Sequence, residues 1–435
     1  MPTYAVPDAP LRRAGGVLGR RGAAWVLYTL CGSLALYPLL ERFIVPLLGV
    51  SFLLSAGSVS LRLAARGFVV PQSFLWAVWG VYGTVYGVWF SVAMLHGNPI
   101  PYINQDSFGF LLYLSAMPVL FLHVHFNGLQ TQFFRFIEGC SLAIAVASVL
   151  LVTGFFLLFG EINEESMALT NLFLRSLGLS WFIDHNHGLL GLYTNTAHLM
   201  LLGSALALHR FTAHHRRRDL WLVGLYLVAM ALDGRRALVI TAVLQLMVAA
   251  PRLMSALRPG QRLALVVGTA VVGSALVLGN LEWIEQRFSF TEEDISTAHR
   301  QAQIPPLLEK IAENPVFGGG FGTVASLLRS ELRPFSYEVD FLATVMKLGV
   351  VGSMLYFGTY LAVLFHAYRR TGSRGIFYAS AGLPFFFYMT TNGNQAMSTD
   401  SAVFHIFLFL LIAFSIVPRT PRIGPGARAA QGAAA

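Results

Sequence analysis

Residues 282–337 read EWIEQRFSFTEEDISTAHRQAQIPPLLEKIAENPVFGGGFGTVASLLRSELRPFSY, one long polar stretch in a chain that is otherwise largely apolar. The stretch holds a run of acidic residues, several arginines and a glycine-rich segment at residues 313–324. On both sides of it lie apolar runs, many of them long enough to cross a bilayer. This pattern predicts membrane-spanning helices with the polar chemistry concentrated in one external loop, at the edge of the bilayer.

The composition points the same way. Of the 435 residues, 55% are apolar and only 12% are charged, about half the charged share of an ordinary soluble domain. We therefore expect an all-α polytopic membrane protein in place of two or three soluble domains. About twelve runs qualify as spans, and they are residues 23–40, 43–57, 74–95, 109–126, 139–160, 188–209, 219–232, 236–252, 262–281, 338–367, 376–391 and 401–417.

The N-terminus is basic and leads directly into the first apolar run. A cleaved signal peptide is the competing interpretation, but no small-residue cleavage site follows that run. The expected organisation has five parts. They are a basic cytoplasmic N-terminus (1–22), transmembrane helices one to nine (23–281), a periplasmic loop that carries the site residues (282–337), transmembrane helices ten to twelve (338–417) and a disordered cytoplasmic tail (418–435).

A formal net charge of +9 suggests a nucleic-acid partner at first sight, but the distribution of the charges argues against one. When the N-terminus is placed in the cytoplasm and the spans alternate, most of the 30 Lys and Arg residues fall on the cytoplasmic side. Most of the 21 acidic residues fall on the other side. This is the bias that the positive-inside rule requires. We therefore expect both termini in the cytoplasm and no nucleic-acid partner.

Two external segments are long. In the first, 161–187, an amphipathic part is suited to lie along the membrane interface. In the second, 294–315 reads as a helix that Pro315 ends, followed by a flexible turn region. The glycines there follow no strand and precede no Gly-Lys-Ser/Thr, so they are not a nucleotide-binding loop. We expect them to let the backbone approach a ligand or another helix closely.

External arginines call for an explanation because the orientation bias works against them. Arg235 and Arg236 lie in a tight turn between two spans. They either reach headgroup phosphates or clamp a diphosphate, for which the guanidinium fork is well shaped. Arg300 opens the loop helix, where a helix dipole favours acids. It either pairs with the acidic run at 292–294 or serves the site.

Other polar residues stand at the ends of spans. Glu338 lies at the start of the tenth span, either as an interfacial marker or as a functional carboxylate. Lys347 follows about two turns into that span, and an ionisable group below the surface is a functional candidate. His187, Asn195 and His198 stand near the start of the sixth span, where a packing role and a functional role both remain open.

Together these residues resemble the O-antigen ligase and O-antigen polymerase superfamily of bacterial inner membranes. That family has about twelve spans and one large periplasmic loop with an arginine, an NPxxGxGxG segment and a later Gly-hydrophobic-hydrophobic-Gly. Arg300, the segment NPVFGGGFGTV at 314–324 and the GVVG at 349–352 match these features. Arg236 in DGRRAL and the GLYTNTAH at 191–198 match two weaker ones.

The chain departs from the family at two positions. The histidine expected of a ligase falls on Glu338, and the arginine usual before the Gly-aromatic stretch falls near His187 or Gly188. A ligase is thought to use that histidine to activate its sugar acceptor. The substitution therefore favours a polymerase over a ligase.

The resemblance implies a glycosyltransferase that needs no metal or cofactor and acts on a glycan linked to undecaprenyl diphosphate. It also implies the lipid bilayer, a chain-length regulator and a flippase as partners. Arg236 and Arg300 are expected to stabilise the diphosphate, and Glu338 is expected to act as the general base. The remaining candidates, all for substrate binding, are Arg235, Arg287, His187, Asn195, His198, Gly320 and Tyr337.

Three other functions compete with this one. The first is a ligase that transfers the finished glycan to lipid A-core or to a protein. The second is a secondary transporter, which about twelve spans would fit, although the sequence shows no inverted repeat. The third is a non-enzymatic subunit of an export complex.

Overall fold

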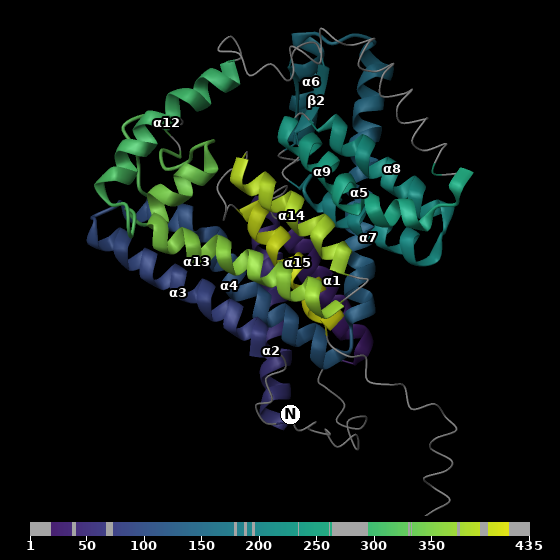
Figure 1. The fold of residues 1–435 in the computed structure, drawn as a ribbon, viewed down its shortest axis with the longest axis horizontal. Coiled ribbons are helices and arrows are strands. Elements are labelled where there is room, and N and C mark those ends of the chain that lie inside the picture. The colour runs from purple at the N-terminus through teal and green to yellow at the C-terminus, as the bar shows by residue number, and fades with distance from the viewer. Residues whose placement is uncertain are drawn as a thin grey trace, which may run out of the picture.

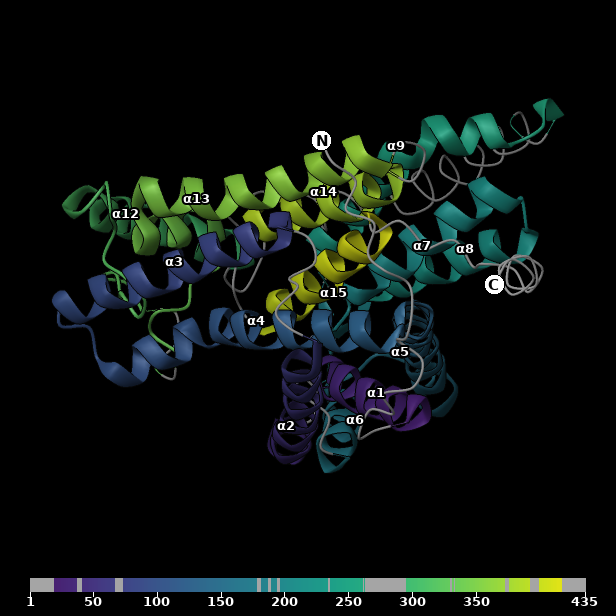
Figure 2. The ribbon, with the colours of Figure 1, turned by 90° about the horizontal axis from the view of Figure 1, so that it is seen from below.

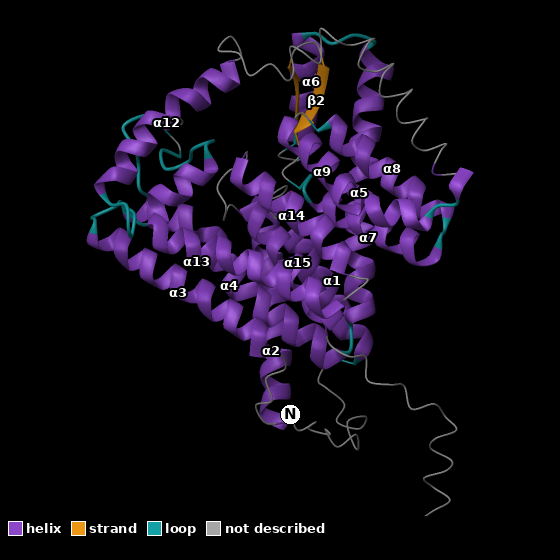
Figure 3. Cartoon of the chain, in the orientation of Figure 1, coloured by secondary structure: helices purple, strands orange, loops and turns teal. Residues whose placement is uncertain are grey.

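The computed structural model describes residues 19–36, 41–66, 73–177, 181–186, 189–193, 196–233, 235–260, 262, 295–328, 331, 333–371, 375–391 and 399–416. Helices make up nearly all of these residues, together with one small two-stranded sheet (Figures 1 and 3). The all-α class predicted from the sequence is therefore confirmed.

The elements follow one another along the chain in this order. The first helices are α1 (Arg20–Leu36), α2 (Glu41–Arg66), α3 (Ser73–Leu95), α4 (Ile100–Asn127) and α5 (Gln130–Phe159). A short helix α6 (Glu164–Ser176) and the strands β1 (Phe182–Asn186) and β2 (Leu189–Tyr193) come next. The remaining helices are α7 (Leu199–His214), α8 (Arg217–Leu232), α9 (Arg236–Ala256), α12 (Ile295–Glu313), α13 (Asp340–Thr371), α14 (Gly375–Thr391) and α15 (Thr399–Ile416).

Five of the described helices, α3, α4, α5, α9 and α13, are long and apolar enough to cross a membrane. Shorter apolar stretches, Leu47–Ser60 in α2 and Ala402–Phe414 in α15, accompany them. A span needs about 20 mainly apolar residues, and these helices provide such stretches. The chain is a membrane protein built from helices. The predicted ninth span, 262–281, lies almost entirely outside the described residues.

The predicted sixth span is wrong over its first part. The sequence predicts a helix from residue 188, but β1 and β2 form an antiparallel hairpin and helix α7 begins only at Leu199. In the hairpin, Ile183 pairs with Leu192, and both side chains are buried in one apolar cluster. A short apolar run satisfies a strand as well as a helix, and here packing favours the strand.

Helix α15 occupies the centre of the bundle (Figures 1 and 2). Every residue from 402 to 414 is buried. A helix that is apolar on all sides must be covered on all sides, and α15 packs against α4, α5, α13 and α14. Phe404 stacks on Phe385 of α14 with ring centroids 3.6 Å apart. This central helix holds together the helices whose ends carry the polar site.

Helix α6 lies within residues 161–187, where the sequence predicts an amphipathic part. It begins with a capping box, in which the Asn163 side chain accepts the Ser166 N–H and the Ser166 hydroxyl accepts the Asn163 N–H. The Asn171 amide pairs with both the N–H and the C=O of Ile183 in β1. Helix α6 and the hairpin therefore form one unit, visible at the top of Figure 3.

Helix α13 is not the continuous span that the sequence predicts. Gly349 has φ 62° and ψ −174°, which breaks the helix into residues 340–348 and 350–371. The rings of Phe341 and Phe357 nevertheless lie 5.8 Å apart, whereas a straight helix would separate these residues by about 24 Å. The first part, which we call the half-helix (340–348), therefore turns back sharply alongside the second.

Candidate functional site

The ion pair between Arg300 and Glu338 lies where α12 meets the half-helix. Arg300 Nε donates to Glu338 Oε2 at 3.1 Å, and the two side chains are 36% and 25% exposed. Gln303 lies one turn beyond Arg300 on the same face of α12, and its Oε1 accepts the Glu338 N–H at 2.8 Å. The structure thus brings two of the three predicted catalytic residues together, in a position that a substrate can reach.

The glycine-rich loop, residues 314–324, bridges the break in α13. Gly319 N–H and Gly320 N–H donate to the carbonyls of Met346 and Lys347 at the end of the half-helix, both at 2.9 Å. On the other side of the break, Val350 N–H donates to Pro315 O at 2.9 Å. A broken helix leaves such groups without their partners in the helix, and the loop replaces those partners.

Glycine is required in this loop by close approach to other backbone. Gly320 has φ +81°, and a Cβ there would overlap the backbone of Ala93 in α3. Gly318 has φ +67°, and a Cβ would overlap Lys347 and Gly349. Of the two uses expected from the sequence, a ligand or another helix, the structure shows the second.

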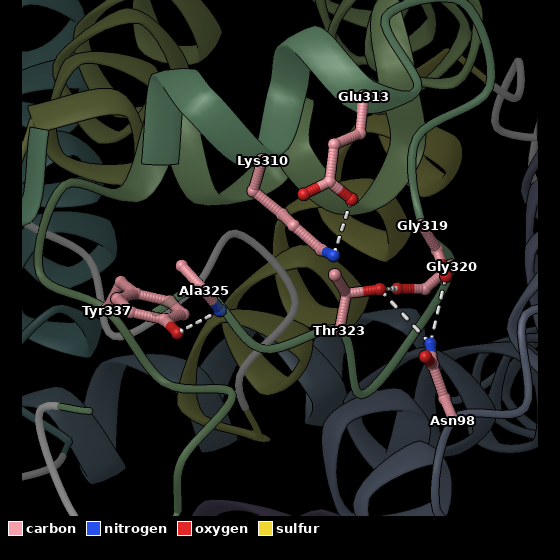
Figure 4. A network of polar contacts seen from close by, with 8 residues as sticks. All are labelled: Asn98, Lys310, Glu313, Gly319, Gly320, Thr323, Ala325 and Tyr337. Atoms are coloured by element: carbon pink, nitrogen blue, oxygen red, sulfur yellow. Dashed lines mark hydrogen bonds and ion pairs between the residues drawn. The ribbon is translucent and has the colours of Figure 1, made fainter. Parts of the chain in front are cut away.

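The loop is also fastened to the turn between α3 and α4 (Figure 4). The Asn98 side-chain N–H₂ group donates to Gly319 O and Phe321 O, both at 2.9 Å, and lies 3.1 Å from Thr323 Oγ1. Trp89 Nε1 donates to Phe317 O at 2.7 Å. The α3–α4 turn and the glycine-rich loop are therefore on the same side of the molecule, as the predicted alternation of spans requires.

A buried charge pair completes this junction. Lys347 Nζ lies 2.7 Å from Asp106 Oδ1, and the other oxygen of Asp106 accepts the Gly322 N–H at 2.7 Å. Asp106 is 7% exposed and Lys347 is 5% exposed. One carboxylate thus joins α4 to the glycine-rich loop and to the half-helix.

Arg235 belongs to a second polar group, at the start of α9. Its Nη1 donates to the Tyr388 hydroxyl of α14 at 3.2 Å, and its Nε lies 3.7 Å from Asp233 Oδ1. Asp233 is buried, and its carboxylate balances the positive charge of this guanidinium. Arg236 begins α9, but its side chain is outside the described part of the structure. Helix α14, which carries Tyr388, packs against both α9 and α13.

Three other candidates are buried in the packing. His198 precedes α7 and has the rings of Phe385 and Phe404 within 6 Å. The Tyr337 hydroxyl accepts the Ala325 N–H at 2.6 Å (Figure 4), and burial raises the pKa of this phenol. Gly320 is covered by α3, as described above. The remaining candidates, Arg287, His187 and Asn195, lie outside the described residues.

Several residues of the site were not predicted. Asp106 is a lone acid at the head of an apolar run, which is the same signal that pointed to Lys347. Asn98, Asp233 and Tyr388 carry no such signal, because single polar residues near span ends are common, and Gln303 is one of many polar residues in the stretch 282–337. Their roles depend on which helices are neighbours.

An open hollow of about 390 Å³ lies on the α3 side of the glycine-rich loop. It is separate from the ion pair, because Arg300 and Glu313 are about 20 Å apart along α12. Its lining is mainly apolar with a polar edge, formed by Val92, Leu95, His96, Glu313, Asn314, Pro315, Val316, Phe317 and Gly318.

Among the described residues, no group of three His, Cys, Asp or Glu side chains is placed to hold a metal ion. A scan against protein-family models and a search of curated proteins find no match to this chain. The function is therefore argued from the site itself.

Proposed function

We propose that the chain is a glycosyltransferase that polymerises oligosaccharide repeat units linked to undecaprenyl diphosphate at the periplasmic face of the bacterial inner membrane. The observation that carries the proposal is the part-exposed pair of Arg300 and Glu338 between the loop helix and the half-helix. A carboxylate and a guanidinium held side by side are the two groups that this transfer needs.

The reaction assigns a role to each group. Glu338 takes the proton of an acceptor hydroxyl as its oxygen attacks the anomeric carbon of the donor. The bond from that carbon to the diphosphate oxygen breaks, and negative charge grows on the leaving diphosphate. Arg300 and Arg236 stabilise that charge. Arg235, held by Asp233 and Tyr388, orients the start of α9, where Arg236 is the first residue.

The finer topology belongs to the same proposal. It has about twelve spans, both termini in the cytoplasm, and the glycine-rich loop, α12 and the α3–α4 turn on the periplasmic side. The bias of Lys and Arg toward the other side supports this orientation. A chain-length regulator and a flippase are the proposed protein partners, and the bilayer supplies the lipid-linked donor.

A ligase is the first alternative, and it would need Glu338 to take the role of the histidine that the ligases of the similar family have at this position. The two activities differ in the acceptor. A polymerase needs only the lipid-linked glycan, whereas a ligase also needs lipid A-core.

The test uses purified protein in nanodiscs with undecaprenyl-diphosphate-linked glycan from the native host, with and without lipid A-core. We expect a ladder of products from the lipid-linked glycan alone, and its loss in Arg236→Ala and Glu338→Gln. Product that forms only when lipid A-core is added would favour the ligase. Full activity in either variant would remove that residue from the mechanism.

A secondary transporter is the second candidate, and the broken helix α13 is the observation that favours it. Transporters bind substrate with the open ends of broken helices. Here, however, Met346, Lys347 and Val350 at the break pair with the backbone of the glycine-rich loop. These pairings leave the enzyme as the better supported function. If folded protein forms no product from the lipid-linked glycan, with or without lipid A-core, the result would favour the transporter.

A further inference from the structure

The carboxylate of Asp106 lies at a point where three segments distant in sequence meet. It accepts the Gly322 N–H of the glycine-rich loop and pairs with Lys347 of the half-helix, both at 2.7 Å. Asp106 itself lies in the second turn of α4, a helix that packs against the central helix α15. Through this one side chain, the loop and the half-helix are connected to the core of the bundle.

The half-helix needs such a connection because Gly349 separates it from the rest of α13. Its final carbonyls accept hydrogen bonds from the glycine-rich loop, and Glu338 lies two residues before its first residue, Asp340. A glycine with φ 62° and ψ −174° leaves the angle between two helices poorly fixed by the backbone alone. The direction of the half-helix, and with it the position of Glu338, therefore depends on what holds residues 340–348 from outside.

Because it is buried, the Asp106–Lys347 pair is sensitive to the loss of either partner. Both side chains are more than nine-tenths buried, so either charge alone would be costly to leave without its partner. The pair persists only while α4 and the half-helix stay in register.

We propose that Asp106 is a positioning residue, which sets the place of Glu338 by fixing the glycine-rich loop and the half-helix to α4. Its catalytic consequence depends on the function proposed above, but its effect on the loop does not. Two readouts therefore separate the two claims: the packing of the loop, and the kinetics of glycan transfer.

The packing of the loop is measured at Ala325, the residue that directly follows it, which is 4% exposed and packs with the buried Tyr337. An Ala325→Cys thiol in a background with Cys31→Ala and Cys140→Ala should react slowly with a water-soluble maleimide. We expect Asp106→Asn to raise this rate about tenfold or more. We also expect kcat to fall at least tenfold with KM nearly unchanged, because detached loops leave fewer assembled sites.

The matched control is Asp219→Asn, which removes a fully buried acid from its pair with Arg210 elsewhere in the molecule. This variant should leave the Ala325→Cys thiol protected. If Asp106→Asn does not fold, D106N/K347M serves in its place, because it leaves neither charge alone. It should show the same fast labelling and low kcat.

Protection of the thiol together with unchanged kcat in D106N/K347M would overturn the proposal. So would a labelling rate in Asp219→Asn as high as that in Asp106→Asn. If Asp106→Asn speeds the labelling of the Ala325→Cys thiol but the wild-type protein forms no glycan product, the positioning role stands and the proposed function is refuted.

Discussion

At residue 320 the chain needs both a backbone conformation and a close contact that only glycine provides. Its φ is +81°, and its Cα faces the backbone of Ala93. We predict that Gly320→Ala lowers the free energy of unfolding by about 2 kcal/mol or more, from the left-handed conformation together with the overlap. The measurement is the thermal unfolding midpoint in detergent.

The control for this substitution is Gly87→Ala in the middle of α3, where a Cβ would have open space around it. Alanine is favoured over glycine inside a helix, so this variant should unfold at the wild-type temperature or slightly above it. An unfolding midpoint of Gly320→Ala equal to that of the control would mean that the loop does not pack on α3.

Single residues could be predicted where their chemistry conflicts with their surroundings. Lys347, a charge within an apolar run, and Arg300, a cation on the loop helix, were predicted on this ground, whereas Asp106 carries the same signal and was not predicted. What the sequence did not contain was the pairing, since Asp106 and Lys347 are 241 positions apart. The sequence left open whether Arg300 pairs with the acids at 292–294, which lie outside the described residues, or serves the site, and the structure pairs it with Glu338.

At the scale of elements, α6 presents an apolar stripe away from the hairpin. Leu169, Leu172 and Phe173 on this stripe are 52%, 66% and 56% exposed. The exposed apolar end of α5 precedes it by a few residues, with Leu157 and Leu158 about 80% exposed. An amphipathic helix continuous with the lipid-facing side of a span lies in the headgroup boundary.

We predict that a spin label at Leu172→Cys is accessible to oxygen dissolved in lipid. A label at Glu165→Cys, in the first turn of the same helix, should instead be accessible to a water-soluble nickel reagent. Power-saturation electron paramagnetic resonance in nanodiscs measures both. Access of the nickel reagent to Leu172→Cys, equal to that at Glu165→Cys, would place α6 away from the membrane.

Helix α12 was predicted with the right type and nearly the right limits, and the amphipathic part predicted within residues 161–187 contains α6. The hairpin was missed because a short run such as LLGLY fits a strand and a span equally well. The break in α13 was also missed, since one glycine in an apolar run is usually tolerated within a helix. The loop that packs on Gly349 supplies hydrogen-bond partners on both sides of the break, and these contacts lie far away in the sequence.

At the scale of the whole molecule, the composition alone established a helical membrane protein. The arrangement of the spans did not follow from it, because lipid-facing and buried helices are similarly apolar. Helix α15 illustrates this: its sequence does not show that it is the central helix, covered on all sides.

The orientation of the molecule yields a further prediction. Both native cysteines, Cys31 and Cys140, lie within helices and can be replaced to give a thiol-free background. A membrane-impermeant maleimide added to spheroplasts should label Glu309→Cys on α12. It should label Arg217→Cys, at the first residue of α8, only after permeabilisation. The reverse pattern would invert the topology and place the proposed site in the cytoplasm.

In the proposed mechanism, Arg300 and Glu338 act chemically and do more than hold α12 against the half-helix. The most direct measurement compares wild type with R300E/E338R in the glycan ladder assay, after both proteins are shown to unfold at similar temperatures. A part-exposed pair contributes less than about 1 kcal/mol to stability, and reversal restores the attraction. We expect the reversed variant to fold normally and to lose the ladder by about 100-fold or more. A ladder at the wild-type rate would show that the pair is structural and would contradict the proposed mechanism.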